Sequence, residues 1–228
     1  MSGSNRRLRR FALAGMLGPI AWWLLIVLNG AITPGYSHVS DFISTLGSVG
    51  APYAFLQQLN FGIFGGSILA LAAGIHFWFD DGRRPRVSTA LLGVFGSGVL
   101  LAAVFPENPA APDSVTDTLH TIVSIVAFLA GVSAVSLVTR RLGAEDRWPT
   151  YRYEPAVTPV VVLMTFVVSV STVIIESPLL GLTQRVFIGV MSLWVAGQSR
   201  RLYRLSGESD QVELDEEWSK SSDSETVG

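Results

Sequence analysis

The chain has 228 residues, of which 49% are hydrophobic and 15% are charged, and its formal net charge is −2. A soluble domain usually carries about 25% charged residues, so this composition indicates a membrane protein. Cysteine is absent, which excludes disulfide bonds and thiolate metal sites. The positive charges are explained by membrane topology, as described below, and we expect no nucleic-acid partner.

Long apolar runs follow one another along the chain and predict an all-α bundle of six transmembrane helices. A helix needs about 20 apolar residues to cross the hydrocarbon of a bilayer. The runs that meet this length use almost the whole of residues 11–205, so we expect one transmembrane domain. The predicted spans are 11–32, 54–79, 87–105, 118–139, 156–176 and 182–203.

Arginines stand in clusters at alternate ends of these runs, and positive charge marks the cytoplasmic side of a membrane protein. We therefore expect a multi-pass protein of the cell membrane with both termini in the cytoplasm, including a basic N-terminal segment, 1–10. The acidic segment 206–228 is too polar to bury surface, and we expect it to be a disordered cytoplasmic tail. The clusters are Arg6, Arg7, Arg9 and Arg10; Arg83, Arg84 and Arg86; Arg140, Arg141, Arg147 and Arg152; and Arg200, Arg201 and Arg204.

Two local patterns add detail to this topology. In the first external segment, Phe42, Ile43 and Leu46 recur at helical spacing, which predicts a short interfacial helix on or in the outer leaflet. Small residues four apart, such as Gly62 with Gly66 and Gly93 with Ser97, predict places where helix backbones approach closely in lipid. Gly131 and Gly189 are further small residues within the spans.

Polar side chains collect at the external ends of the predicted spans. Ionisable groups near membrane depth usually face a cavity or a partner, so we interpret this set as a ligand-binding vestibule. Arg185 lies on the side that otherwise lacks arginine, and we consider an ion pair with Glu176 as well as contact with an anion or lipid head group. The candidate residues are His38, Asp41, Ser44, Asp117, His120, Glu176, Gln184 and Arg185.

Two of these pairs, His38 with Asp41 and Asp117 with His120, have a spacing that places both members on one helical face. Two imidazoles and two carboxylates could bind a divalent metal such as zinc, and an open coordination position would then activate water. Asp41 and Asp117 also stand where helix N-caps stand, so a purely structural role is the alternative. No residue is assigned a catalytic role.

Three motifs resemble the domain-of-unknown-function 998 family of small integral membrane proteins with about six spans. They are HVSDFISTLGSVGAP after the first span, the LH of DTLHTIV at the fourth, and GLTQR at the sixth. The resemblance covers residues 11 to about 205 and implies an architecture without implying an activity. The recurring polar positions of the family correspond here to Asp41, Ser44, Gly47, His120, Gln184 and Arg185.

These observations favour a non-catalytic protein that binds a lipid or small ligand, or supports a membrane-protein partner or a homo-oligomer. One alternative is a metal-dependent, membrane-embedded lipid hydrolase, since the chain is distantly similar to the alkaline ceramidase group. It lacks the paired histidines that those enzymes carry on a last span. The other alternative is a small transporter or channel, although no charged residue stands near the middle of any span, where coupling sites usually lie.

Overall fold

A computed structural model describes residues 3–79 and 85–225, with side chains from 5 to 79 and from 85 to 207. Within this part of the chain every long element is a helix, and no strand is found. Six helices are long and apolar enough to cross a membrane, which confirms the predicted all-α, six-span architecture. The helices are α1 (Gly3–Ile32), α2 (Ala54–Trp78), α3 (Arg86–Val104), α4 (Val115–Gly143), α5 (Glu154–Ile174) and α6 (Leu180–Glu225).

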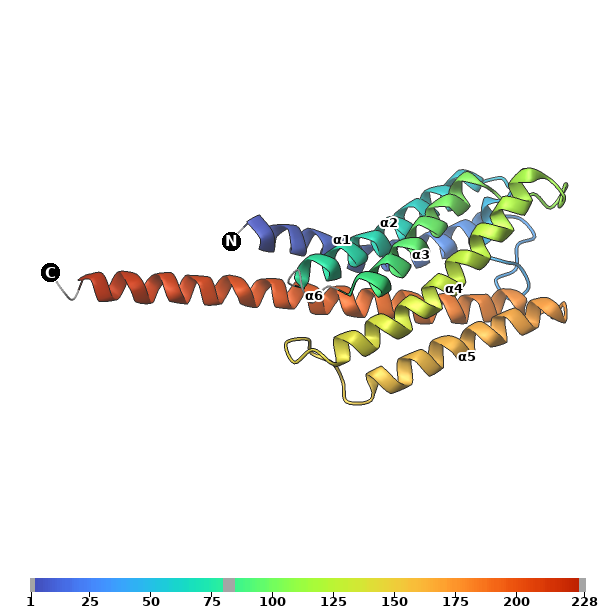
Figure 1. Cartoon of the computed structure of the whole chain (residues 1–228). Coiled ribbons are helices and arrows are strands. Elements are labelled where there is room, and N and C mark those ends of the chain that lie inside the picture. The colour runs from blue at the N-terminus through green and yellow to red at the C-terminus, as the bar shows by residue number, and fades with distance from the viewer. Residues whose placement is uncertain (1–2, 80–84, 226–228) are drawn as a thin grey trace.

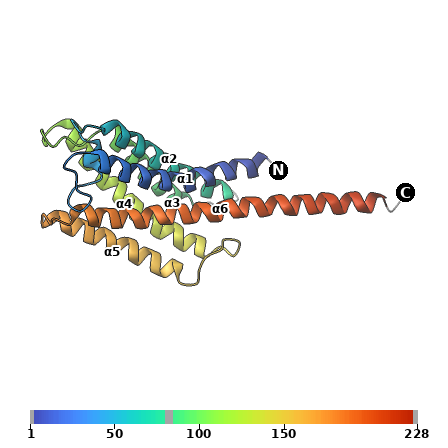
Figure 2. The same ribbon diagram turned by 180° about the vertical axis from the view of Figure 1, so that it is seen from behind.

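The helices form a closed ring, because each packs on the next in sequence and α6 packs on α1. α1 and α6 leave the bundle at the same end, which we call the basal end, together with residues 144–153 (Figure 1). The segments 33–53, 105–114 and 175–179 lie at the opposite, distal end, as the view from behind also shows (Figure 2). The even number of spans thus places the three predicted external segments together.

Two helices extend past the predicted membrane spans. α1 begins at Gly3, so it includes most of the basic segment 1–10. α6 continues as a helix to Glu225 and projects from the basal end through most of the segment 206–228 (Figure 1). That the tail is disordered in solution stays a prediction.

Glycines permit close approach of neighbouring helices, as predicted, but mostly at other positions. A Cβ atom on Gly65 of α2 would lie 2.7 Å from the carbonyl oxygen of Gly96 on α3, and Gly98 meets Ala127 of α4. By contrast, added Cβ atoms on Gly62, Gly66 and Gly93 would have no neighbour within 4 Å. The small-residue spacing therefore identified helices that pack closely without identifying the face on which they do so.

Exposed apolar side chains cover the outside of the ring, which is the surface expected to face lipid. α5 is the least buried span: 17% of its most apolar window is buried, against 33–44% in the other five. It contacts α4 and α6, whereas α1 to α4 form a more tightly packed group. α5 therefore lies at the periphery of the bundle, as Figure 1 shows.

The segment after α1 contains one turn of 3-10 helix, η1 (Ser44–Gly47), where a short interfacial helix was predicted. Ile43 and Leu46 are 2% and 1% exposed, so these apolar side chains pack into the bundle. The backbone N–H of Val49 donates to the carbonyl of Glu107, 2.8 Å away, and ties the segment to the loop before α4. In this structure the segment covers the bundle.

The cytoplasmic placement of the termini can be tested with single cysteines, because the natural chain contains none. Val49 and Asp113 are exposed at the distal end, and Ala144 and Asp146 are exposed at the basal end. With arginine-rich ends inside, a membrane-impermeant maleimide should label Val49→Cys and Asp113→Cys on intact cells. It should label Ala144→Cys and Asp146→Cys only after the membrane is permeabilised. Labelling of either basal cysteine on intact cells would contradict this orientation.

Candidate functional site

Asp41 organises a tight turn in the distal segment 33–53. Its Oδ2 accepts a hydrogen bond from the backbone N–H of Ser37 at 2.8 Å, and its Oδ1 accepts from the Ser40 hydroxyl at 3.1 Å. The Tyr36 hydroxyl donates to the carbonyl of Phe42 at 2.9 Å. The carboxylate of Asp41 is therefore engaged within its own loop.

The first turns of α6 hold this loop against the bundle. The backbone N–H of Ile43 donates to Gln184 Oε1 at 2.8 Å, and Arg185 Nη1 donates to the carbonyl of Asp41 at 2.8 Å. Gly181 permits the contact, since an added Cβ would lie 2.8 Å from Asp41 N and overlap the Asp41 carbonyl oxygen. Two of the motifs noted in the sequence thus bind each other directly, and we call this contact the loop clamp.

Arg185 is 9% exposed, and its partners are neutral oxygen atoms. It donates to the carbonyls of Asp41 and Gly181 and to the Tyr36 hydroxyl. Glu176 is exposed and occupies a left-handed backbone position, with φ of 51°. Among the described residues, no ion pair joins Glu176 to Arg185. The guanidinium therefore supports the loop, and the alternative of an ion pair is not found.

His38 and Tyr36 titrate under the influence of the same guanidinium. Burial raises the pKa of Tyr36 above its usual value, and the nearby Arg185 only partly opposes this effect. Partial burial lowers the pKa of His38, and the positive charge of Arg185 lowers it further. The His38 ring packs edge-on against Tyr36, with centroids 5.2 Å apart. His38 is thus a half-buried packing residue, and its ring also lies against Gly30 of α1.

A cavity of about 320 Å³ lies under the loop clamp. Its inner wall is aromatic, and its distal part is polar. The aromatic residues are Trp22, Phe42, Phe61, Phe64, Phe95 and Phe128. The polar residues are Ser44, Glu107, Asp117, His120, Thr121, Ser124 and Gln184. The cavity therefore combines an apolar interior with a polar end.

The polar end is built by residues around the start of α4. His120 Nδ1 lies 2.8 Å from the carbonyl oxygen of Phe105. Asp117 Oδ1 accepts from the backbone N–H of Asn108 at 2.7 Å, in the first turn after the N-cap Ser114. These contacts fix the orientation of both side chains while leaving further acceptor positions available.

The outer wall of the cavity extends to the lipid-facing surface. Ile125 of α4 and Val173 of α5 line the cavity, yet they are 54% and 44% exposed on the outside of the bundle. Val173 stands at the distal end of α5, where α4 and α5 diverge (Figure 1). An apolar chain could therefore reach the cavity from the membrane without crossing the polar end.

The predicted vestibule residues fall into different groups in space. Ser44, Asp117, His120 and Gln184 line the cavity, whereas Asp41 and Arg185 form the loop clamp. His38 and Glu176 are not among the cavity-lining residues.

The zinc hypothesis required His38, Asp41, Asp117 and His120 to converge. In the part of the chain that the structure describes, no three His, Cys, Asp or Glu side chains lie close enough to hold a metal ion. The sequence interpretation also gave no role to Glu107 and the aromatic wall.

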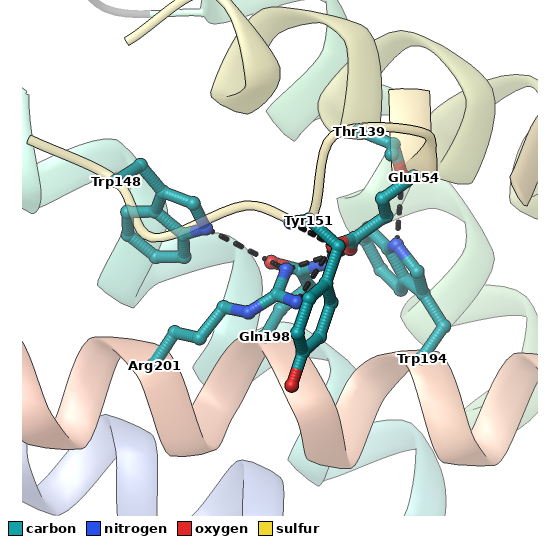
Figure 3. A network of polar contacts seen from close by, with 7 residues as sticks. All are labelled: Thr139, Trp148, Tyr151, Glu154, Trp194, Gln198 and Arg201. Atoms are coloured by element: carbon teal, nitrogen blue, oxygen red, sulfur yellow. Dashed lines mark hydrogen bonds and ion pairs between the residues drawn. The ribbon is translucent and has the colours of Figure 1, made fainter. Parts of the chain in front are cut away.

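A second polar cluster lies at the basal end, between α5 and α6 (Figure 3). Arg201 donates from both terminal nitrogens to the Glu154 carboxylate, at 2.6 Å each. Gln198 Nε2 donates to the same carboxylate at 2.9 Å, and Trp148 Nε1 donates to Gln198 Oε1 at 3.1 Å. These groups satisfy one another, so the cluster fastens α5 and the preceding loop to α6.

Fold and site together define a multi-pass helical membrane protein with a loop-covered cavity at one end. The chain belongs to the family described as "Protein of unknown function (DUF998)", whose profile matches residues 16–200, and this confirms the resemblance seen in the sequence. No curated protein and no solved structure matches the chain.

The loop clamp predicts opposite effects of alanine at two glycines of α6. Gly181→Ala should lower stability by about 1–3 kcal/mol, because the new methyl group overlaps the Asp41 backbone. Gly197→Ala is the matched control, since an added Cβ there has no neighbour within 4 Å. It should be neutral or stabilise by up to about 1 kcal/mol through helix propensity. Thermal unfolding in detergent measures both, and equal melting temperatures would argue against the clamp.

The basal cluster predicts coupling between Glu154 and Arg201, whose side chains are 13% and 15% exposed. Glu154→Gln should cost about 3 kcal/mol, because it leaves the Arg201 guanidinium without its anion. The double variant Glu154→Gln, Arg201→Gln should recover much of this loss. Arg200→Gln changes an exposed neighbour on the same helix and should have little effect. Additive losses in a double-mutant cycle would show that the two residues act independently.

Proposed function

We propose that this protein binds a lipid-like amphiphile at the outer face of the cell membrane. The polar group of the ligand would lie among the distal polar side chains, and its apolar part would lie against the aromatic wall. The observation that supports this proposal is one cavity with a polar end, an aromatic interior and a wall that reaches the lipid-facing surface.

The size and lining of the cavity agree with this use. Small-molecule sites typically have volumes of about 300–1,000 Å³ and are mostly apolar, with a few polar groups that fix orientation. The cavity is about 320 Å³, near the lower limit of that range, so it suits a single slender chain. Trp22, which lines it, has a buried Nε1–H with no partner among the described residues. A hydroxyl or carbonyl oxygen of a ligand would satisfy this donor.

The orientation follows from the charges at the two ends. The described arginines other than Arg185 lie at or near the basal end, which the positive-charge rule assigns to the cytoplasm. The distal cavity would then open toward the outer leaflet. A lipid could enter between α4 and α5, where α5 is weakly packed, and leave its polar group under the loop clamp.

Filling the cavity should displace the ligand without unfolding the protein. Ser124→Phe places a ring in the cavity, whereas Val126→Phe places the same ring on the exposed face of α4. Native mass spectrometry of protein extracted in mild detergent should detect bound lipid in wild-type and Val126→Phe protein. Ser124→Phe should lose most of it at an unchanged melting temperature.

Two results of this comparison would contradict the proposal. One is wild-type protein that retains no lipid-like molecule after extraction. The other is equal retention in the Ser124 and Val126 variants, which would place any bound lipid on the outer surface of the bundle.

A further inference from the structure

We infer that the ligand of this cavity carries a cationic head group of the ammonium class. This inference rests on the proposed function and specifies the chemistry of the same site. Three observations carry it: the charge of the distal end, the hydrogen-bonding type of the polar groups that line the cavity, and the spacing of the acidic groups.

The distal end is strongly negative. Asp41, Glu107, Asp113, Asp117 and Glu176 are opposed by one arginine, Arg185, whose nearest contacts are with Tyr36 and the loop backbone. Two of these carboxylates, Glu107 and Asp117, line the cavity. Among the described residues neither forms an ion pair, and the partners found for them are a hydroxyl and a backbone N–H. A carboxylate at membrane depth is stabilised by a nearby cation.

His120 supplies a second, independent indication. It is 9% exposed and lines the cavity. Because a carbonyl oxygen can only accept, the 2.8 Å contact of Nδ1 with the Phe105 carbonyl makes Nδ1 the donor. In the Nδ1–H tautomer Nε2 is an acceptor, and no partner for it is found in the described part of the chain. A ligand in the cavity that donates a hydrogen bond would satisfy this acceptor.

The remaining polar groups include two donors. Gln184 Oε1 already accepts from the backbone of Ile43, which leaves the Gln184 amide NH₂ as a donor, and the Trp22 Nε1–H has no partner among the described residues. The hydroxyls of Ser44, Thr121 and Ser124 can donate or accept, so they fit either kind of head group. Carboxylate oxygens and His120 Nε2 are thus the fixed acceptors of the cavity.

An extended organic cation fits this arrangement better than a metal ion. Divalent cations need ligand atoms gathered within about 2.0–2.6 Å of one centre. No three His, Cys, Asp or Glu side chains in the described part lie close enough for that. The acceptors are instead distributed around one cavity, and its aromatic faces attract organic cations as well. An alkylammonium group can contact several such acceptors at once.

The test uses three single-chain probes with the same twelve-carbon tail: dodecylamine, dodecanol and dodecanoate. Binding to the full-length protein in nanodiscs is measured by equilibrium dialysis, with protein-free nanodiscs subtracted. We expect dodecylamine to bind wild-type protein at least about tenfold more tightly than either other probe. Glu107→Gln and Asp117→Asn should each reduce this preference several-fold.

Asp113→Asn is the matched control, because Asp113 is an exposed distal carboxylate that does not line the cavity. It should leave the preference for dodecylamine unchanged if local contacts, rather than general surface charge, select the head group. Melting temperatures of all variants show whether each one folds. Glu107→Gln keeps the shape of the side chain, so it provides a result even if Asp117→Asn weakens the start of α4.

The outcomes separate this inference from the proposed function. Equal binding of the three probes, all blocked by Ser124→Phe, would retain an amphiphile site and overturn the cationic head group. An amine preference that Glu107→Gln leaves unchanged, or that Asp113→Asn removes, would also overturn it. If no probe binds wild-type protein and extracted protein retains no lipid, both proposals fail.

Discussion

The distal end depends on the hydrogen bonds of one buried guanidinium, for which the described part of the chain supplies no carboxylate partner. Burying a charge costs free energy unless hydrogen bonds replace its water, and Arg185 obtains them from two carbonyls and one hydroxyl. One carbonyl belongs to its own helix, while the other and the hydroxyl come from the loop after α1. The loop therefore cannot leave without exposing an unsatisfied cation, and the cavity below keeps its cover.

The two ends of the bundle use arginine in opposite ways. At the basal end Arg201 meets a carboxylate in a two-pronged contact, and its charge is neutralised locally. At the distal end the cation organises the backbone, and the cavity carboxylates Glu107 and Asp117 remain without a basic partner among the described residues. α5 connects both ends, yet it is the least buried span. The basal cluster fastens α5 to α6 at one end, and a 2.7 Å hydrogen bond between the Thr172 and Thr183 hydroxyls joins the same two helices at the distal end.

The number and positions of the spans were predictable because they depend on a property averaged over many residues, namely apolar length. The orientation inferred from the arginine distribution stays a prediction. The sequence predicted that the loop motif and the α6 motif lie at the same end of the bundle. It did not predict which of their atoms meet, because Arg185 binds backbone carbonyls that any sequence would supply. The predicted positions of close glycine packing were mostly wrong for a similar reason, because a spacing of four residues occurs on every face of a helix. The aromatic wall could not be recognised because phenylalanines at that density are ordinary in membrane spans.

The contact between α1 and α6 closes the ring, and it has a consequence for biogenesis. The first and last spans are neighbours, and Arg185, which donates to the carbonyl of Asp41, lies 144 residues later in the chain. At about 5–20 residues per second, ribosomes need on the order of ten seconds to supply that partner. During this interval the loop after α1 lacks the contacts with α6 that hold it over the cavity. We therefore expect the nascent protein to be most exposed to misassembly before α6 inserts.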